Sequence, residues 1–158
     1  MPSRDPTHCR EQLASLMAEQ NTLLATLEGL LTHEHGLLQT RDAEGLENAG
    51  TARQQCIGSI LRIEDDRRAL CRANLRSDDP AGLHSLLAWC DPTGTLLPAM
   101  QEYRDRTLRC REQNDRNGIL VNARLQRASG MTNALAGGTY GPGSDPSRGY
   151  GRKLTTRA

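Results

Sequence analysis

Apolar residues in the first quarter of the chain recur at alternating steps of four and three positions. The steps run through Leu13, Met17, Gln20, Leu24, Leu27, Leu31, Glu34 and Leu38. A second row, which repeats every seven positions, consists of Leu16, Leu23, Leu30 and Leu37. Residues at these spacings share one side of an α-helix. The pattern predicts a long helix over about residues 6–40, with Asp5 as its N-cap and Pro6 in its first turn.

A less apolar run with the same spacing follows a turn signal at Thr40–Asp42. Its members are Leu46, Ala49, Arg53, Cys56, Ile60, Ile63, Arg67, Leu70 and Asn74. This run predicts a second helix over about residues 43–75. Two long helices joined by so short a turn pack as an antiparallel hairpin.

Two proline-containing breaks, at Asp79-Pro80 and Asp91-Pro92, enclose a short apolar segment. Leucines and Trp89 in that segment predict a short amphipathic helix. Because aromatic side chains dominate core burial, we expect Trp89 to fill the core.

A last long helix is predicted from near Thr95 to Ala136, where Gly137-Gly138 is a strong signal for its end. One face is expected to carry Leu97, Met100, Arg104, Thr107, Cys110 or Arg111, Asn114, Gly118, Val121, Leu125, Ala128, Thr132 and Leu135. Residues 138–158 contain five Gly, two Pro and almost no large aliphatic side chain. Such a segment cannot bury enough apolar surface to offset the entropy of ordering, so we predict a disordered tail.

Composition favours the same architecture, because the chain has no Phe, one Val and four Ile, while Leu and Ala supply most of its apolar mass. The predicted fold is all-α: a long antiparallel helical hairpin, a short helix and a long C-terminal helix, like a bundle or coiled coil. Residues 1–137 form the helical domain, and residues 138–158 form a flexible Gly/Pro-rich tail.

Charge is finely balanced, with 20 basic and 19 acidic side chains and a net charge of +1. Pairs four apart, such as Glu64/Arg68 and Glu102/Arg106, predict exposed helix faces. Nucleic-acid binding is not expected, because it favours a basic patch of one sign. The only candidate patch is Arg148, Arg152, Lys153 and Arg157 in the tail.

No run approaches the ~18–20 apolar residues of a membrane span, so membrane insertion is not expected. The polar segment Met1–Arg10 lacks the apolar core of a secretory signal, which favours the cytoplasm. The five cysteines are widely spaced and the four histidines form no metal-binding pair. No catalytic motif occurs either, so we expect a protein that is not an enzyme and needs no cofactor or metal.

The most specific stretch is Asn114-Asp115-Arg116-Asn117-Gly118, followed by an apolar triplet, a helical segment and Tyr140-Gly141. This order resembles the FlgN family of flagellar type III export chaperones. The resemblance implies binding to the hook–filament junction proteins FlgK and FlgL, and docking to the export-gate protein FlhA. We expect residues 119–136 to form the cargo-binding helix. The residues expected to take part in cargo binding begin just before it and are Asn114, Asn117, Gly118, Ile119, Leu120, Val121, Leu125, Ala128, Met131 and Leu135. Gate docking is expected at Tyr140 and Gly141, with Tyr150 as an alternative tyrosine.

Two interpretations of the C-terminal helix remain open. Its apolar face fits an amphipathic partner helix, but the same face could close the bundle. Gly118 fits either a hinge or a tolerated glycine in a packed helix. The main alternative function is a generic helical-bundle or coiled-coil adaptor, and a homodimer is possible under either function.

Overall fold

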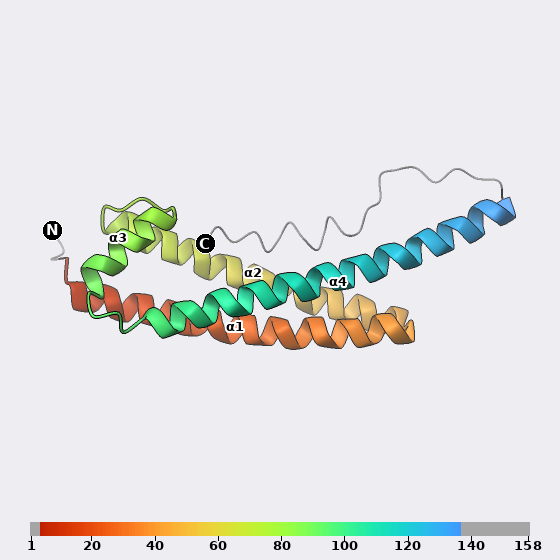
Figure 1. The fold of residues 1–158 in the computed structure, drawn as a ribbon, viewed down its shortest axis with the longest axis horizontal. Helices are drawn as coiled ribbons and strands as arrows, with labels where there is room; N and C mark the ends of the chain where they lie inside the picture. Colours follow the sequence, from red (N-terminus) through yellow and green to blue (C-terminus); the bar gives the residue numbers. More distant parts are fainter. Residues whose placement is uncertain (1–3, 137–158) are drawn as a thin grey trace.

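Four helices make up the computed structural model, which describes residues 4–136 and places side chains for residues 4–120. They are α1 (Pro6–Thr40), α2 (Ala43–Ala73), α3 (Pro80–Cys90) and α4 (Leu97–Ala136), with no strand in residues 4–136. Helices α1 and α2 form an antiparallel hairpin, α3 packs at its open end, and α4 runs beside α1 (Figure 1). The prediction of an all-α fold with this element order is confirmed. The predicted disordered tail, residues 138–158, lies outside the described residues.

Aspartate caps open the first three helices. The carboxylates of Asp5, Asp42 and Asp79 accept hydrogen bonds from backbone N–H groups two or three residues later, at 2.8–2.9 Å. These bonds satisfy donors that have no partner within the helix. At the tip of the hairpin, Arg41 takes the left-handed conformation (φ 59°), which reverses the chain in two residues.

Helix α1 is the central element, and its two flanks differ in chemistry. The half-buried leucine row lies towards α2: Leu23 and Leu30 pack against the core cluster containing Ile57 and Ile60. The opposite flank lies towards α4 and is polar, with residues such as Asn21. Helix α1 therefore meets α2 mainly through apolar contacts and α4 through many directional hydrogen bonds.

The core divides into two clusters along the bundle. One surrounds Leu24, Leu27, Leu31, Cys56, Ile57, Ile60, Tyr103 and Cys110. The other lies at the α3 end and contains Cys9, Leu13, Met17, Cys71, Leu86, Cys90 and Leu96. Several positions in the two predicted apolar runs are occupied by polar side chains that are nevertheless buried, including Gln20, Glu34, Arg53 and Arg67.

The prediction that Trp89 fills the core is wrong. Its ring is only half-buried, at the margin of the α3-end cluster, and the Arg76 guanidinium lies 5.0 Å from the ring centroid. Leu86 and Cys90 point into the core instead. Packing of α3 on α1 and α2 sets its rotation, and the indole gains a cation–π contact at the surface.

The predicted face of α4 is buried as expected at Thr107, Asn114 and Gly118, but it is shifted by about one residue in the first turns of the helix. Tyr103 is buried where Arg104 was expected, and Leu97 is 60 % exposed. The cause lies in the preceding loop, where the Asp91 carboxylate accepts from the backbone N–H groups of Thr95 and Leu96 at 3.0 and 2.9 Å. These bonds start α4 so that Leu96 faces the core.

Of the two charge pairs, Glu102 and Arg106 meet at 3.0 Å as predicted. The expectation of an exposed Glu64/Arg68 pair is wrong, because Glu64 is 2 % exposed and faces Arg67, 3.8 Å away. Burial, the largest influence, raises the pKa of this carboxyl.

Candidate partner-binding helix and its anchor

Helix α4 continues beyond the tip of the α1–α2 hairpin. It runs parallel to α1, and polar contacts join α1 residues to α4 residues 78–86 positions later. The same offset places Thr40, the end of α1, level with residues 118–126, whereas the α4 backbone continues to Ala136. At ~1.5 Å per residue, about 15–27 Å of helix extends past the hairpin. Figure 1 shows this projecting end, with neither α1 nor α2 beside it.

The predicted cargo-binding residues fall into two groups. Asn114, Asn117 and Gly118 are buried within the bundle. At the surface, Ile119 is 68 % exposed and Leu120 is half-buried. The others belong to the helical backbone beyond residue 120, where side chains are outside the described part: Val121, Leu125, Ala128, Met131 and Leu135. Tyr140 and Gly141 lie outside the described residues altogether.

Asn117 anchors α4 at the point where it leaves the bundle. Its side chain is fully buried, and Nδ2 donates to the Leu31 carbonyl at 3.0 Å. Its Oδ1 accepts from Gln113 Nε2 at 2.9 Å and lies 3.1 Å from His35 Nδ1. A buried amide with both ends bonded fixes the rotation and height of the helix that carries it.

A buried ion pair lies next to this anchor. Arg53 Nη1 of α2 donates to both carboxylate oxygens of Glu34 on α1, at 3.0 and 3.1 Å. Asn117 Nδ2 lies 3.4 Å from Glu34 Oε1, so one polar layer joins three helices. The sequence placed Glu34 and Arg53 on apolar stripes but did not pair them. The sequence signal that could have found this pair is the presence of opposite charges at core-facing positions, one in each helix of the hairpin.

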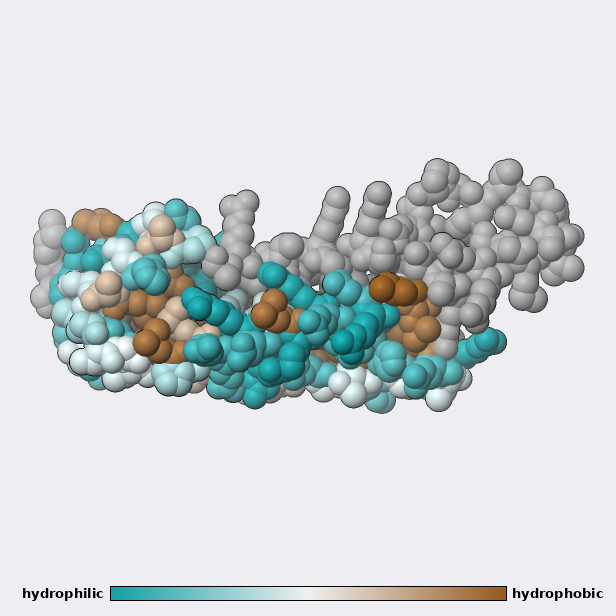
Figure 2. All heavy atoms as spheres, viewed as in Figure 1, coloured by the Kyte–Doolittle hydropathy of each residue, from teal (hydrophilic) through white to brown (hydrophobic). Residues whose placement is uncertain are grey.

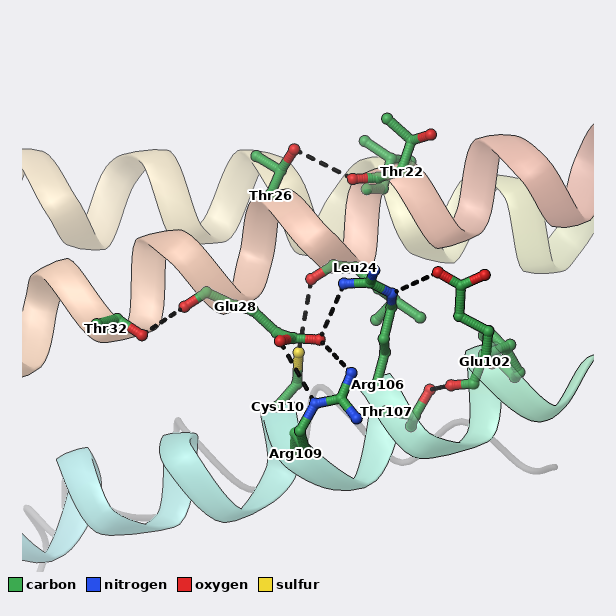
Figure 3. Close-up of polar contacts among 12 residues, drawn as sticks. Thr22, Leu24, Thr26, Glu28, Thr32, Glu102, Arg106, Thr107, Arg109 and Cys110 are labelled. Carbon is green, nitrogen blue, oxygen red and sulfur yellow. Dashed lines mark hydrogen bonds and ion pairs between the residues drawn. The ribbon is translucent and has the colours of Figure 1, made fainter. Parts of the chain in front are cut away.

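A second, more exposed contact holds α4 along its length. Arg106 and Arg109 both reach the Glu28 carboxylate of α1, at 3.3 and 3.2 Å (Figure 3). The Cys110 thiol donates to the Leu24 carbonyl at 3.7 Å on the buried side. Exposed ion pairs contribute little stability each. Here these ion pairs matter for the position of the helices, because they fix the register between α1 and α4.

Chemically, this arrangement offers surfaces for binding. Within residues 4–136, no group of three or more His, Cys, Asp or Glu side chains could hold a metal ion. None of the helices in that range is long and apolar enough to cross a membrane.

All five cysteines are free and buried, and burial raises the pKa of the Cys9 thiol to about 11 and that of Cys110 to about 12. Thiols held protonated in this way are poor nucleophiles.

A hairpin that holds one long, projecting helix is an all-α architecture that can present a helix face to a partner. The chain matches the family model described as FlgN protein over residues 9–158, and it belongs to that family. The FlgN family consists of flagellar export chaperones and is not an enzyme family. Neither the curated proteins nor the solved structures gave a match.

Proposed function

We propose that this protein binds FlgK and FlgL in the cytoplasm, prevents their premature association and delivers them to the flagellar export gate. The observation that carries this proposal is the extension of α4 past the hairpin. A helix end with neither α1 nor α2 beside it can accept a helix of a partner protein. Family membership supplies the kind of partner, a flagellar export substrate.

Residues 119–136 form the proposed cargo-binding helix. Val121, Leu125, Ala128 and Leu135 recur at helical spacing, and Met131 adds a flexible apolar side chain. This pattern suits an amphipathic helix of the cargo, whose apolar face would otherwise promote self-association. Binding alone performs this work, and no cofactor or metal takes part.

Asn114, Asn117 and Gly118 act differently in this proposal. Because all three are buried and Asn117 bonds to Leu31 of α1, they hold and orient the proposed cargo-binding helix from within the bundle. Ile119 is exposed and Leu120 is half-buried, and they mark the boundary between the part of α4 in the bundle and its projecting end.

The double substitution Leu125→Ala with Leu135→Ala tests the cargo-binding helix. Loss of two apolar anchors should weaken binding to purified FlgK by at least about tenfold in calorimetric titration. The matched control is Leu97→Ala with Leu108→Ala, which removes two exposed leucines of the same helix within the bundle. Equal loss in both variants, or unchanged affinity in the first, would contradict the proposal.

Gate docking is proposed at Tyr140-Gly141. Tyr140→Ala should leave FlgK affinity unchanged and weaken capture by the cytoplasmic domain of FlhA. Tyr150→Ala is the matched control, since Tyr150 is also flanked by glycine. If Tyr150→Ala alone impairs capture, the docking tyrosine is misassigned; if Tyr140→Ala releases cargo, the two tasks are not separate.

A further inference from the structure

All four helices meet around a small cavity at the α3 end of the bundle, far from the projecting end of α4. The cavity measures about 40 Å³ and is lined by Met17, Gln20, Arg67, Leu83, Met100, Tyr103 and Arg104. Figure 2 shows apolar side chains gathered at this end, whereas the middle of the same face is largely hydrophilic. The cavity is thus lined mainly by apolar atoms, with a few polar groups from Gln20, Arg67 and Arg104 among them.

Gln20 is the unusual member of this lining. Its side chain is 2 % exposed, and Nε2 has no hydrogen-bond partner among the described residues. A buried donor without a partner is destabilising, since it has lost its water without replacement. This position therefore favours a ligand that accepts a hydrogen bond.

The charges around the cavity favour an anionic acceptor. Arg67 is buried, and its only ion pair among the described residues is a long one, 3.8 Å to Glu64. Glu64 is also bonded to Tyr103 Oη at 3.4 Å. Arg104 is exposed at the rim and forms no ion pair with a described residue. The lining thus offers two guanidinium groups and one amide donor, but no carboxylate of its own.

Size restricts the occupant to a few heavy atoms. A cavity needs roughly 10–15 Å³ to hold one water, and small-molecule sites usually measure about 300–1,000 Å³. At about 40 Å³ the space fits the tip of one side chain and excludes a nucleotide or other cofactor.

We propose that this cavity receives one glutamate side chain from a helix of a partner protein. The methylene stem lies against Met17, Leu83 and Met100, and the carboxylate accepts from Gln20 Nε2 and Arg67. This anchor point is independent of the proposed cargo helix. It gives the chaperone a second, charge-selective contact at the opposite end of the bundle.

Propionate, which has the size and charge of a glutamate side chain, is the first probe, and propionamide is its neutral control. The NMR signal of the Gln20 side-chain amide, assigned by its absence in Gln20→Met, should shift saturably with millimolar propionate. Propionamide and sodium chloride at equal concentration should leave it unmoved. No shift with propionate, as for a cavity filled only by water, or equal shifts with propionamide, would overturn the proposal.

The variant Gln20→Met keeps the side-chain volume and removes the unpaired amide, so the protein should fold with no loss of stability. In this variant the Arg67 Nε signal should no longer respond to propionate. Gln101→Met, on the exposed face of α4, should keep the full response. A response that survives Gln20→Met would place the anion elsewhere.

A pair of alanine-rich helical peptides separates a side-chain carboxylate from a chain-terminal one. One carries a central glutamate and an amidated C-terminus, and the other carries glutamine there with a free C-terminus. Only the glutamate peptide should shift the Gln20 signal. A shift by the free-terminus peptide instead would reject the glutamate assignment.

Discussion

Glu34 and Arg53 face each other between α1 and α2, and both side chains are largely buried. Each group depends on the other, because an isolated buried charge is far more costly than a buried pair. Burial also disfavours a charge on the Cys110 thiol, which is surrounded by core residues and remains protonated. The stability of the bundle therefore depends more on these buried polar residues than on its surface ion pairs, which contribute little.

Arg53→Met should lower the free energy of unfolding by about 3–5 kcal/mol, because it leaves the Glu34 carboxylate buried and unpaired. Adding Glu34→Leu in the same chain should recover most of that loss. Urea denaturation measures both changes. Arg68→Met, at a more exposed pair with Asp65, is the control and should cost less than about 1 kcal/mol. Equal losses in the single and double variants would argue against a coupled pair.

The Cys110 thiol predicts a loss of stability at alkaline pH. Burial, its largest influence, raises its pKa from 9.0 to about 12 in the folded protein. Above about pH 9 the unfolded chain releases this proton while the folded chain keeps it, so stability falls as pH rises, by at most ~1.4 kcal/mol per pH unit for this thiol. Cys110→Ala should be less stable than the natural chain at about pH 8, and the gap should narrow by about pH 10. A gap of constant size would show that this thiol does not contribute.

Among the elements, α1 provides two different contact surfaces. Its leucine row holds α2, and its polar flank orients α4 through Asn21, Glu28 and the Asn117 anchor. Directional bonds of this kind set the register of α4, and hence the direction in which its free end projects. The end of α4 that we propose as the cargo-binding helix is therefore positioned by residues outside that proposed contact surface.

Asn117→Ala tests this anchor. Loss of its bonds to Leu31, Gln113 and His35 should cost about 1–3 kcal/mol. Amide hydrogen exchange should accelerate in residues 110–120 and remain unchanged in α2. Asp115→Ala, an exposed change on the same turn, should leave exchange unaltered. Uniform acceleration through the whole bundle would indicate general destabilisation and no local anchor.

Glycines offer a comparison of helix positions. A Cβ at Gly29 or Gly58 would meet no atom within 4 Å, so Gly→Ala at either site should stabilise the protein by about 1 kcal/mol. At Gly82 a Cβ would lie 1.7 Å from the Ser77 carbonyl oxygen, so Gly82→Ala should disrupt the α2–α3 connection and lower stability. Thermal melting of the three variants checks the order. Stabilisation by Gly82→Ala would contradict the geometry.

At the scale of the whole molecule, the sequence predicted the helices and their order, because apolar periodicity and Asp caps are local signals. It could not predict the rotation of short elements: Trp89 looked like core by size, yet the packing of α3 leaves it only half-buried at the margin of the core. Nor could it pair Glu34 with Arg53, since that contact depends on the register between two helices. The motif Asn114 to Gly118 was noticed, but the burial of Asn114, Asn117 and Gly118 became visible only in three dimensions.

The molecule as a whole is a compact bundle with one extended arm. Helices α1–α3 and the first part of α4 form the support, and the last turns of α4 project from the hairpin tip (Figure 1). This division predicts that cargo binding alters the arm and spares the support. The Gln20 cavity lies in the support, so its ligand should act independently of the arm.

Hydrogen–deuterium exchange of the full chain, with and without purified FlgK, tests the central claim most directly. We predict slowed exchange over residues 119–136 when FlgK is present, with α1, α2 and α3 essentially unchanged. The region bound by cargo would then coincide with the part of α4 beyond the hairpin. Slowed exchange on the α1–α2 hairpin, with residues 119–136 unaffected, would contradict the claim.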